Sequence, residues 1–432
     1  MKLYFLALSK YFITFFMALY TFSCFNVFRY KNESARKAVY IRQIVYMLLI
    51  YVLSFMVIVI KTTDLRFFLF FVISLVFIVS YILINYLIYK NANRLITHNM
   101  CMLIMVSYII IIRLSYDKAI RQLFISIFAL IITSFIPFII SKGPFFSKLK
   151  WTYAILGLVT LICVLVFSVA TNGAKISITL YNVTFQPSEF VKILFIFAMA
   201  SFLSKANSFF DIALTSAIAA AHVLVLVLSK DLGGAVILFF IYLCMLYVAR
   251  SNVLYMFLGL ILGGIGSVIG YKLFSHVRVR VNAFLYPFET IDNAGYQIAQ
   301  SLFAIGTGGF FGLGLFEGMP KTIPVVASDF VFSAIAEEMG VFFAICLILI
   351  CLSCFVMFMN IAIKFENDFY KYVAVGLGIL YSFQVLLTIG GVTKFIPLTG
   401  VTLPLVSYGG TSLLVSITMF MIIQGLYIGR NK

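Results

Sequence analysis

The chain has 432 residues, of which 64% are hydrophobic and only 10% are charged. So few polar side chains cannot cover a soluble globule of this size, and a soluble enzyme is therefore excluded. The net charge of +17 comes from basic residues that are spread over short segments between apolar runs. This distribution is typical of topology control in a membrane and not of nucleic-acid binding.

The apolar runs have the length that a helix needs to cross about 30 Å of hydrocarbon. They predict about thirteen membrane helices, so the expected fold is an all-α polytopic membrane bundle. In chain order the expected spans are 4–28, 44–60, 67–89, 100–115, 123–140, 152–170, 191–204, 212–229, 232–249, 253–271, 331–358, 372–390 and 411–428.

Basic residues at positions 29–42 place the first connection in the cytoplasm and the N-terminus outside. Alternation then puts the C-terminus in the cytoplasm and leaves three unusual loops outside, at 171–189, 272–329 and 391–410. Long loops in a compact membrane protein are usually functional, and irregular backbone enters a membrane only against protein or water. We therefore expect the functional site on the outer side, between these loops.

A first group of charged residues follows the loop at 171–189. Glu189 and Lys192 lie three residues apart on one helix face, behind Gln186 and a proline. They either cap the helix and snorkel to the surface, or pair inside a cavity. Asp231 precedes two glycines, either in a solvated turn or buried beside Lys192, where the three charges would satisfy one another.

Asp329 ends the longest outer loop and precedes a helix that carries Glu337 and Glu338. Spacing alone favours Asp329 as a helix N-cap, but acidic residues in a membrane helix are costly and favour a functional explanation. The same loop supplies cations, polar side chains and a glycine-rich stretch at 306–309, which suit a phosphate ligand or a simple turn. These side chains are Arg278, Arg280, Lys321, Tyr296, Gln297, Gln300 and Ser301.

The sequence lacks the common signatures of hydrolases and ATPases. It contains no HExxH pattern, no Walker loop and no GxSxG elbow. We expect no organic cofactor.

Five segments resemble, in order, the SEDS family: the shape, elongation, division and sporulation proteins of the RodA, FtsW and SpoVE type. They are QPSEFVK (186–192), KDLGGA (230–235), YQIAQSLFAIGTGGFFGLGL (296–315), SDFVFSAIAEEMG (328–340) and GGVTKFIPLTGVTLPLVSYGGTSLL (390–414). The resemblance implies a core of about ten membrane helices at 151–432, with the large outer loop at 272–330. Residues 1–150 would then add about three N-terminal membrane helices of unknown role.

The resemblance implies a peptidoglycan glycosyltransferase that polymerises lipid II on the outer face of a bacterial plasma membrane. It would work within the lipid bilayer beside a class B penicillin-binding transpeptidase. Because undecaprenyl pyrophosphate is already a good leaving group, one carboxylate base suffices. By the resemblance Asp329 is that base, taking the proton of the incoming GlcNAc 4-hydroxyl, with inversion at the anomeric carbon.

The departing pyrophosphate needs positive charge, which Arg278, Arg280, Lys321 or a divalent ion such as Mg²⁺ or Mn²⁺ could supply. The resemblance assigns Glu189, Lys192 and Asp231 to shaping a central cavity. We expect substrate-binding or supporting roles for Gln186, Gln297, Gln300, Ser301, Glu337, Glu338, Ser407 and Tyr408.

The chain departs from the family pattern at three places. Gly173–Ser177 reads GAKIS where GA-x-R-W is common, Tyr286 replaces the aspartate of F-x-D-P, and Lys394 stands where many members have glycine. The first change favours an alternative, a noncatalytic scaffold for the transpeptidase. A lipid II flippase is the other alternative, because a charged cavity also suits transport, which would depend more on Glu189, Lys192 and Asp231 than on Asp329.

Overall fold

A computed structural model describes residues 2–30, 32–168, 178–180 and 183–430. The first part of the chain forms α1 (Lys2–Arg29), α2 (Glu33–Thr62), α3 (Leu65–Ile88), α4 (Arg94–Leu114), α5 (Tyr116–Thr133), α6 (Ile136–Lys142), the 3-10 helix η1 (Pro144–Lys148) and α7 (Lys150–Phe167). A small antiparallel hairpin of β1 (Ile178–Leu180) and β2 (Val183–Phe185) follows, in which Ile178 lies opposite Phe185.

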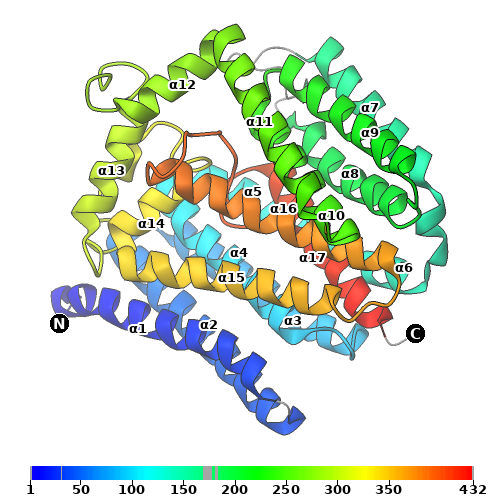
Figure 1. Cartoon of the computed structure of the whole chain (residues 1–432). Coiled ribbons are helices and arrows are strands. Elements are labelled where there is room, and N and C mark those ends of the chain that lie inside the picture. Colours follow the sequence, from blue (N-terminus) through cyan, green and yellow to red (C-terminus); the bar gives the residue numbers. More distant parts are fainter. Residues whose placement is uncertain (1, 31, 169–177, 181–182, 431–432) are drawn as a thin grey trace.

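The rest of the chain forms α8 (Pro187–Leu203), α9 (Phe209–Leu228), α10 (Leu232–Arg250), α11 (Val253–Leu273), α12 (Ser275–Leu285), α13 (Tyr296–Gly308), η2 (Pro320–Thr322), α14 (Val331–Met339), α15 (Val341–Ala362), α16 (Asp368–Val392) and α17 (Gly410–Gly429). Figure 1 shows these helices as one bundle, with the N-terminus and the C-terminus at opposite ends.

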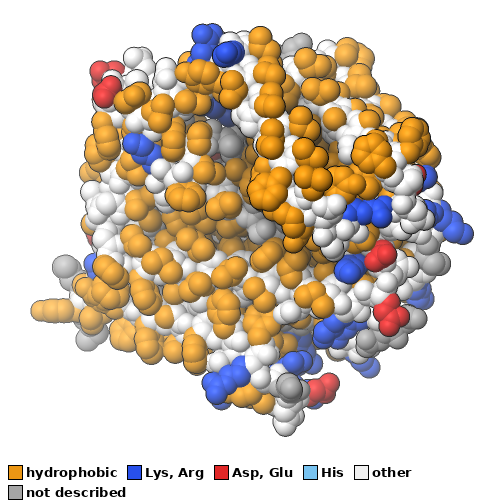
Figure 2. Space-filling model, in the orientation of Figure 1, with side chains coloured by type: hydrophobic (Ala, Val, Ile, Leu, Met, Phe, Trp, Pro, Cys, Tyr) orange, Lys and Arg blue, Asp and Glu red, His pale blue; other side chains and the backbone are white. Residues whose placement is uncertain are grey.

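Within the described residues, twelve helical segments are long and apolar enough to cross a membrane, with α5 and α6 counted as one. The remaining expected span corresponds to α8, a 17-residue helix whose side chains are nearly all buried. Apolar side chains cover the middle of the face in Figure 2, and charged side chains lie toward its edges. The expected polytopic all-α fold is therefore confirmed, and the chain is a multi-pass membrane protein.

Several helices extend beyond the apolar runs that predicted them. α2 begins at Glu33 and α4 at Arg94, several residues before the expected starts at 44 and 100. The side chains of Asn32 and Asn93 accept backbone N–H groups at these two ends. Capping by asparagine therefore allows polar turns outside the apolar run to continue the helix, which hydropathy alone does not reveal.

The centre of the bundle is occupied by α4. Every residue of its most apolar window is buried, as are most residues of α16 and α17. α4 packs against α2, α5, α15 and α17. α4 carries polar side chains such as His98, Asn99 and Arg113, which a membrane helix directs toward the protein interior, so this central position is expected.

α1 and α2 lie side by side along one edge of the bundle, next to α15 (Figure 1). A buried polar network joins them to the core: Tyr20 and Cys24 of α1 donate to Asn99 of α4, which donates to Ser353 of α15 at 2.7 Å. The ring of His98 contacts Gln43 of α2 at 2.8 Å. Because buried polar groups need partners, this network fixes the register of the N-terminal helices on the core.

The longest outer loop contains regular structure that the apolar pattern did not predict. It forms α12, α13 and η2, and Figure 1 shows α12 and α13 at one end of the bundle. The expected span 331–358 was wrong in one respect, because it breaks at Gly340, whose φ is +89°. The break separates the short α14 from the membrane helix α15.

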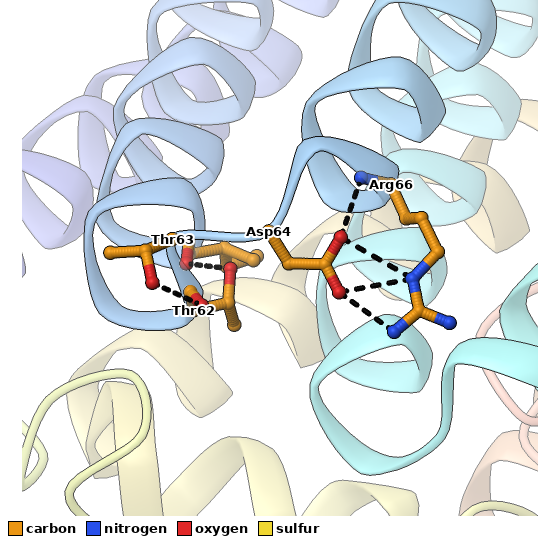
Figure 3. Close-up of polar contacts among 5 residues, drawn as sticks. Thr62, Thr63, Asp64 and Arg66 are labelled. Atoms are coloured by element: carbon orange, nitrogen blue, oxygen red, sulfur yellow. Dashed lines mark hydrogen bonds and ion pairs between the residues drawn. The ribbon is translucent and has the colours of Figure 1, made fainter.

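The turn between α2 and α3 is tight and has its own ion pair (Figure 3). Thr63 ends α2 with a φ of +54°, and Asp64 caps α3 by accepting the N–H of Arg66 at 2.9 Å. The Arg66 guanidinium also pairs with the Asp64 carboxylate at 2.8 Å. Asp64 therefore belongs to the turn and not to the site described below.

Candidate functional site

Asp329 lies between η2 and α14 and is half-buried. Its backbone N–H donates to the carbonyl of Val325 at 3.3 Å. The N-cap of α14 is Phe330, and no side chain caps that helix, so the interpretation of Asp329 as a cap was wrong. The Asp329 carboxylate is therefore not used to cap α14.

The loop between α16 and α17, residues 393–409, fixes the backbone just before Asp329. The N–H of Tyr408 donates to the carbonyl of Ala327 at 2.8 Å, and the Ser407 hydroxyl donates to the carbonyl of Ser328. The Ser407 hydroxyl also accepts the N–H of Leu403 at 2.9 Å. Ser407 and Tyr408 thus lie where expected, at the same site as Asp329, and their contacts position its backbone.

Arg280 of α12 reaches the same point from the other side. Its guanidinium donates to the carbonyl of Thr399 at 3.1 Å. A Cβ built on Gly400 would lie 3.7 Å from Asp329 Oδ2 and 4.0 Å from Arg280 Nη2. The carboxylate and the guanidinium therefore both lie next to Gly400, whose φ of +75° favours glycine.

Burial and charge act on Asp329 in opposite directions. Burial raises the pKa of its carboxyl above the usual value, whereas a hydrogen bond with Ser328 and the charge of Arg280 lower it. A carboxylate with a raised pKa that still has a cation nearby suits a general base.

The second charged group lies next to the first. Glu189 and Lys192 of α8 are 7% and 4% exposed and form an ion pair of 2.5 Å. Asp231 caps α10 by accepting the N–H of Gly234 at 2.8 Å. Burial raises the pKa of Asp231, and the charges of Lys192 and Arg280 oppose this effect. The charge of Arg280 thus lowers the pKa of both Asp231 and Asp329, which links the two charged groups.

The hinge before α10 also packs on the last outer loop. A Cβ on Gly233 would lie 3.1 Å from the carbonyl of Thr399, the same group that accepts from Arg280. Gln186 is joined to this loop as well, because its N–H donates to the Thr411 hydroxyl at 3.1 Å. Segments far apart in the sequence therefore meet around residues 399–411.

Some predicted site residues lie elsewhere. Ser301 is fully buried, donates to the carbonyl of Val392 at 2.8 Å and contacts the Ser333 hydroxyl, so its contacts join helices. Arg278 and Lys321 are exposed and make no side-chain contacts with the described part of the chain. Gln297 and Gln300 are half-buried on α13, again without side-chain hydrogen bonds among described residues.

The glycine-rich stretch at 306–309 ends a helix. Gly308 is the last residue of α13, and a Cβ there would lie 2.1 Å from the carbonyl of Ala336 in α14. Gly309 then reverses the chain with a φ of +56°. Of the two interpretations of this stretch, the structure places it as a close helix contact and turn.

Glu337 and Glu338 are both buried and hold the chain that precedes Asp329. Glu337 accepts the N–H of Met319 at 2.8 Å. Glu338 pairs with Arg113 of α4 at 2.8 Å, and Arg113 also donates to the carbonyl of Gly318. Arg113 was not predicted from the sequence, although a lone arginine within the apolar run at 100–115 is a signal for a buried partner.

The described side chains around Asp329 do not form a metal site by themselves. Among the described residues, no group of three or more His, Cys, Asp or Glu side chains gathers as a metal site. Mg²⁺ is commonly held by one or two carboxylates together with substrate phosphates, and Asp329 supplies one carboxylate of this kind.

The departures from the family pattern differ in their structural context. Lys394 has a φ of +57°, the conformation in which glycine is favoured, so the backbone there is like that of a glycine. Tyr286 is exposed at the end of α12. Gly173–Ser177 lies outside the described residues.

Comparison with known proteins gives several matches. The family model described as cell cycle protein, which covers FtsW, RodA and SpoVE, matches residues 89–431. The peptidoglycan glycosyltransferase RodA of Mycobacterium bovis is 35% identical over 277 residues, which is 60% of this chain and 59% of that protein. The chain thus spans about three fifths of the length of the RodA relatives that it matches. Stage V sporulation protein E of Bacillus subtilis is 31% identical over 68% of this chain and 82% of its own length.

Solved structures show the same fold. A structure described as "Structural coordination of polymerization and crosslinking by a peptidoglycan synthase complex" contains a chain with a TM-score of 0.67 and 22% identity, covering 79% of this chain and 99% of that one. Thermus thermophilus rod shape determining protein RodA gives a TM-score of 0.60 at 23% identity, with 79% and 98% covered. The chain therefore belongs to the family of FtsW, RodA and SpoVE cell cycle proteins.

Proposed function

We propose that this protein is a peptidoglycan glycosyltransferase that polymerises lipid II, with Asp329 as the general base. The observation that carries the proposal is the half-buried Asp329 carboxylate, which lies near the Arg280 guanidinium at Gly400. The names of the relatives, peptidoglycan glycosyltransferases RodA and FtsW, support the same reaction.

The chemistry needs one base and one source of positive charge. Asp329 takes the proton of the acceptor 4-hydroxyl while that oxygen attacks the anomeric carbon of the donor sugar. The bond between that carbon and the pyrophosphate oxygen breaks, and undecaprenyl pyrophosphate leaves with the bonding electrons. Attack opposite to the leaving group inverts the anomeric carbon and produces a β-linked strand from an α-linked donor.

Arg280 is the group best placed to meet the departing pyrophosphate. All three predicted cations are exposed, but Arg280 is the one that donates to the Thr399 carbonyl and lies near the Asp329 carboxylate at Gly400. The side chains of Arg278 and Lys321 make no hydrogen bond or ion pair within the described chain. A guanidinium offers paired N–H donors that match phosphate oxygens. A divalent cation, if bound, would supply further positive charge at the pyrophosphate.

Glu189, Lys192 and Asp231 give the site its charge balance. Glu189 and Lys192 neutralise each other in an ion pair, Asp231 caps α10, and Arg280 adds a positive charge that acts on Asp231. We assign these three residues to shaping the cavity.

We further propose that the site faces the outside of a bacterial plasma membrane and that a class B penicillin-binding transpeptidase is the partner. The excess of basic residues at positions 29–42 supports a cytoplasmic first connection. The C-terminus lies at the other end of the bundle from the N-terminus, as a cytoplasmic C-terminus requires (Figure 1). The similarity to a chain of a peptidoglycan synthase complex that coordinates polymerization and crosslinking supports such a partner.

Two assays on one set of proteins test the function. Wild type, Asp329→Asn and Lys37→Met, a control at an exposed lysine of α2, are purified and given labelled lipid II, with and without the cognate transpeptidase. We expect glycan polymer from wild type and the control, and a loss of at least about a hundredfold in Asp329→Asn. Polymer at equal rates from Asp329→Asn contradicts the proposal. Lipid II transfer between vesicle leaflets without any polymer would favour the flippase alternative, and neither activity would favour the scaffold.

A further inference from the structure

The first two helices contact one segment of the longest outer loop, residues 309–319. Lys10 of α1 donates to the carbonyl of Gly312 at 2.9 Å, and the ring of Tyr11 lies 5.2 Å from that of Phe311. Lys61, near the end of α2, pairs with Glu317. α1 and α2 both precede residue 89, where the family match begins. This part of the chain, outside the family match, therefore reaches the segment that leads to the site.

The 309–319 segment is built onto the end of α14. The N–H groups of Leu313 and Gly314 donate to the carbonyls of Glu337 and Glu338, each at 2.9 Å. A Cβ on Gly312 would lie 2.3 Å from the Glu338 carbonyl, so no space separates the two. The 309–319 segment and the end of α14 therefore form one closely packed unit.

α14 connects this unit to Asp329. The helix begins two residues after Asp329, is nine residues long and is buried over its whole length, so it spans about 13 Å. At the Asp329 end of α14, Ser407 and Tyr408 donate hydrogen bonds to the backbone carbonyls of residues 328 and 327. Because close-packed interiors transmit displacements, a shift at Met339 reaches the Asp329 end.

We propose that α1 and α2 brace the 309–319 segment, and that Lys10 and Lys61 are positioning residues for Asp329. The proposal rests on the proposed function, in which Asp329 is the base. Lys61 and Glu317 are 29% and 53% exposed, and such a pair is weak by itself. Lys10 and Lys61 therefore act together, and we expect neutralising both to release the segment more than neutralising either alone.

Three variants of the full-length protein isolate this contact. Lys10→Met with Lys61→Met removes both bracing charges with a side chain of similar length that suits a membrane helix. Lys61→Glu with Glu317→Lys exchanges the partners of the ion pair and is compared with each single change. Lys37→Met is the matched control, because Lys37 is an exposed lysine at the opposite end of α2 without a side-chain partner in the described chain.

Hydrogen exchange over residues 309–319 and steady-state polymerisation are measured for each variant. We expect the double methionine variant to exchange faster at Leu313 and Gly314 and to lose about fivefold in kcat with little change in KM, because the substrate contacts remain. The charge exchange should restore both readouts relative to the single reversals, and Lys37→Met should match wild type. A general loss of folding would instead lower the melting temperature and would not be rescued.

Unchanged exchange at Leu313 and Gly314 in the double methionine variant would refute the brace. Faster exchange with an unchanged kcat would refute the positioning role. Failure of the proposed function has a different signature, because wild type would then equal Asp329→Asn in polymer yield. The exchange comparison would still decide whether the brace exists.

Discussion

Asp329 is a half-buried carboxylate whose properties depend on one neighbouring cation. Burial raises the pKa of Asp329, and Arg280 lowers it. The base must be ionised to accept a proton, so activity is lost as the pH falls through the pKa of Asp329. In the proposed reaction, Arg280 therefore widens the pH range in which Asp329 is ionised, in addition to the proposed contact with the pyrophosphate.

Removal of Arg280 should change both the rate and its pH dependence. In Arg280→Ala the pKa of Asp329 rises further, so the acid limb of the kcat/KM profile moves to higher pH. The loss of one preorganised charge should also lower kcat by about a hundredfold. Arg280→Lys keeps the charge and should return the acid limb toward wild type. An acid limb that stays in place in Arg280→Ala would show that Arg280 does not act on the base.

Gly400 lies next to both Asp329 and Arg280 and should not tolerate a side chain. Its φ of +75° costs an alanine about 1–2 kcal/mol, and the new methyl would lie 3.7 Å from Asp329 Oδ2. We expect Gly400→Ala to lower kcat by about tenfold. Gly264→Ala is the control, because a Cβ there meets nothing within 4 Å. Equal kcat values for the two variants would contradict the placement of Gly400.

At the level of elements, α14 is the short helix that joins the segment ending at Asp329 to the bundle. Arg113 of α4 holds its far end through Glu338 and the carbonyl of Gly318. α14 is not one of the membrane-spanning helices. Burial raises the pKa of Glu338 to about 7, even though the charge and hydrogen bond of Arg113 oppose it.

Loss of Arg113 should destabilise the protein in a pH-dependent way. In Arg113→Met the pKa of Glu338 rises further, so Glu338 is neutral at pH 7 and the loss is mainly that of two buried hydrogen bonds, about 1–3 kcal/mol. A group whose pKa is raised by folding loses stability as the pH rises, so the difference from wild type should grow above pH 7. Thermal unfolding at several pH values measures this, with Arg113→Met/Glu338→Gln as the control that removes the pH dependence. A pH-independent difference would contradict the role given to Glu338.

Some of the observed helices and site residues could be predicted from the sequence, and others could not. Apolar runs predicted the membrane helices because burial in hydrocarbon determines them, and the charged motifs identified Asp329, Asp231, Glu189 and Lys192. The helices α12 and α13 were missed because, with 11 and 13 residues, they are too short to give the long apolar run by which a membrane helix is recognised. The role of Arg280 over Arg278 was not predictable, since it depends on which face of α12 meets Thr399.

At the scale of the whole molecule, the contacts at one end of the bundle come from many parts of the chain. The N-terminal half of α1, the end of α2, the end of α4 and the loop between α16 and α17 all meet near α14 or the segment that packs on it. The division expected at residue 150 stays a prediction. The family match begins earlier, at residue 89, and α4 lies within it at the centre of the bundle. The motifs that carry the resemblance all lie beyond residue 172. The earlier part of the family match, which includes α4, was therefore not recognised from the sequence.

Cysteine labelling of intact cells tests the proposed orientation. Glu289, in the loop after α12, and Glu366, between α15 and α16, are exposed at what we propose are opposite sides of the membrane. In a Cys163→Ser background, which removes the exposed native thiol, Glu289→Cys should react with an impermeant maleimide in intact cells. Glu366→Cys should react only after permeabilisation. The reverse pattern would place the site in the cytoplasm.

The most direct test of the account is gel-resolved polymerisation of labelled lipid II by the purified protein, with wild type compared with Asp329→Asn at matched folding. We predict a ladder of glycan strands from wild type and almost none from Asp329→Asn, because the amide cannot accept the proton. Strands of the same length and amount from both proteins would contradict the assignment of Asp329 as the base.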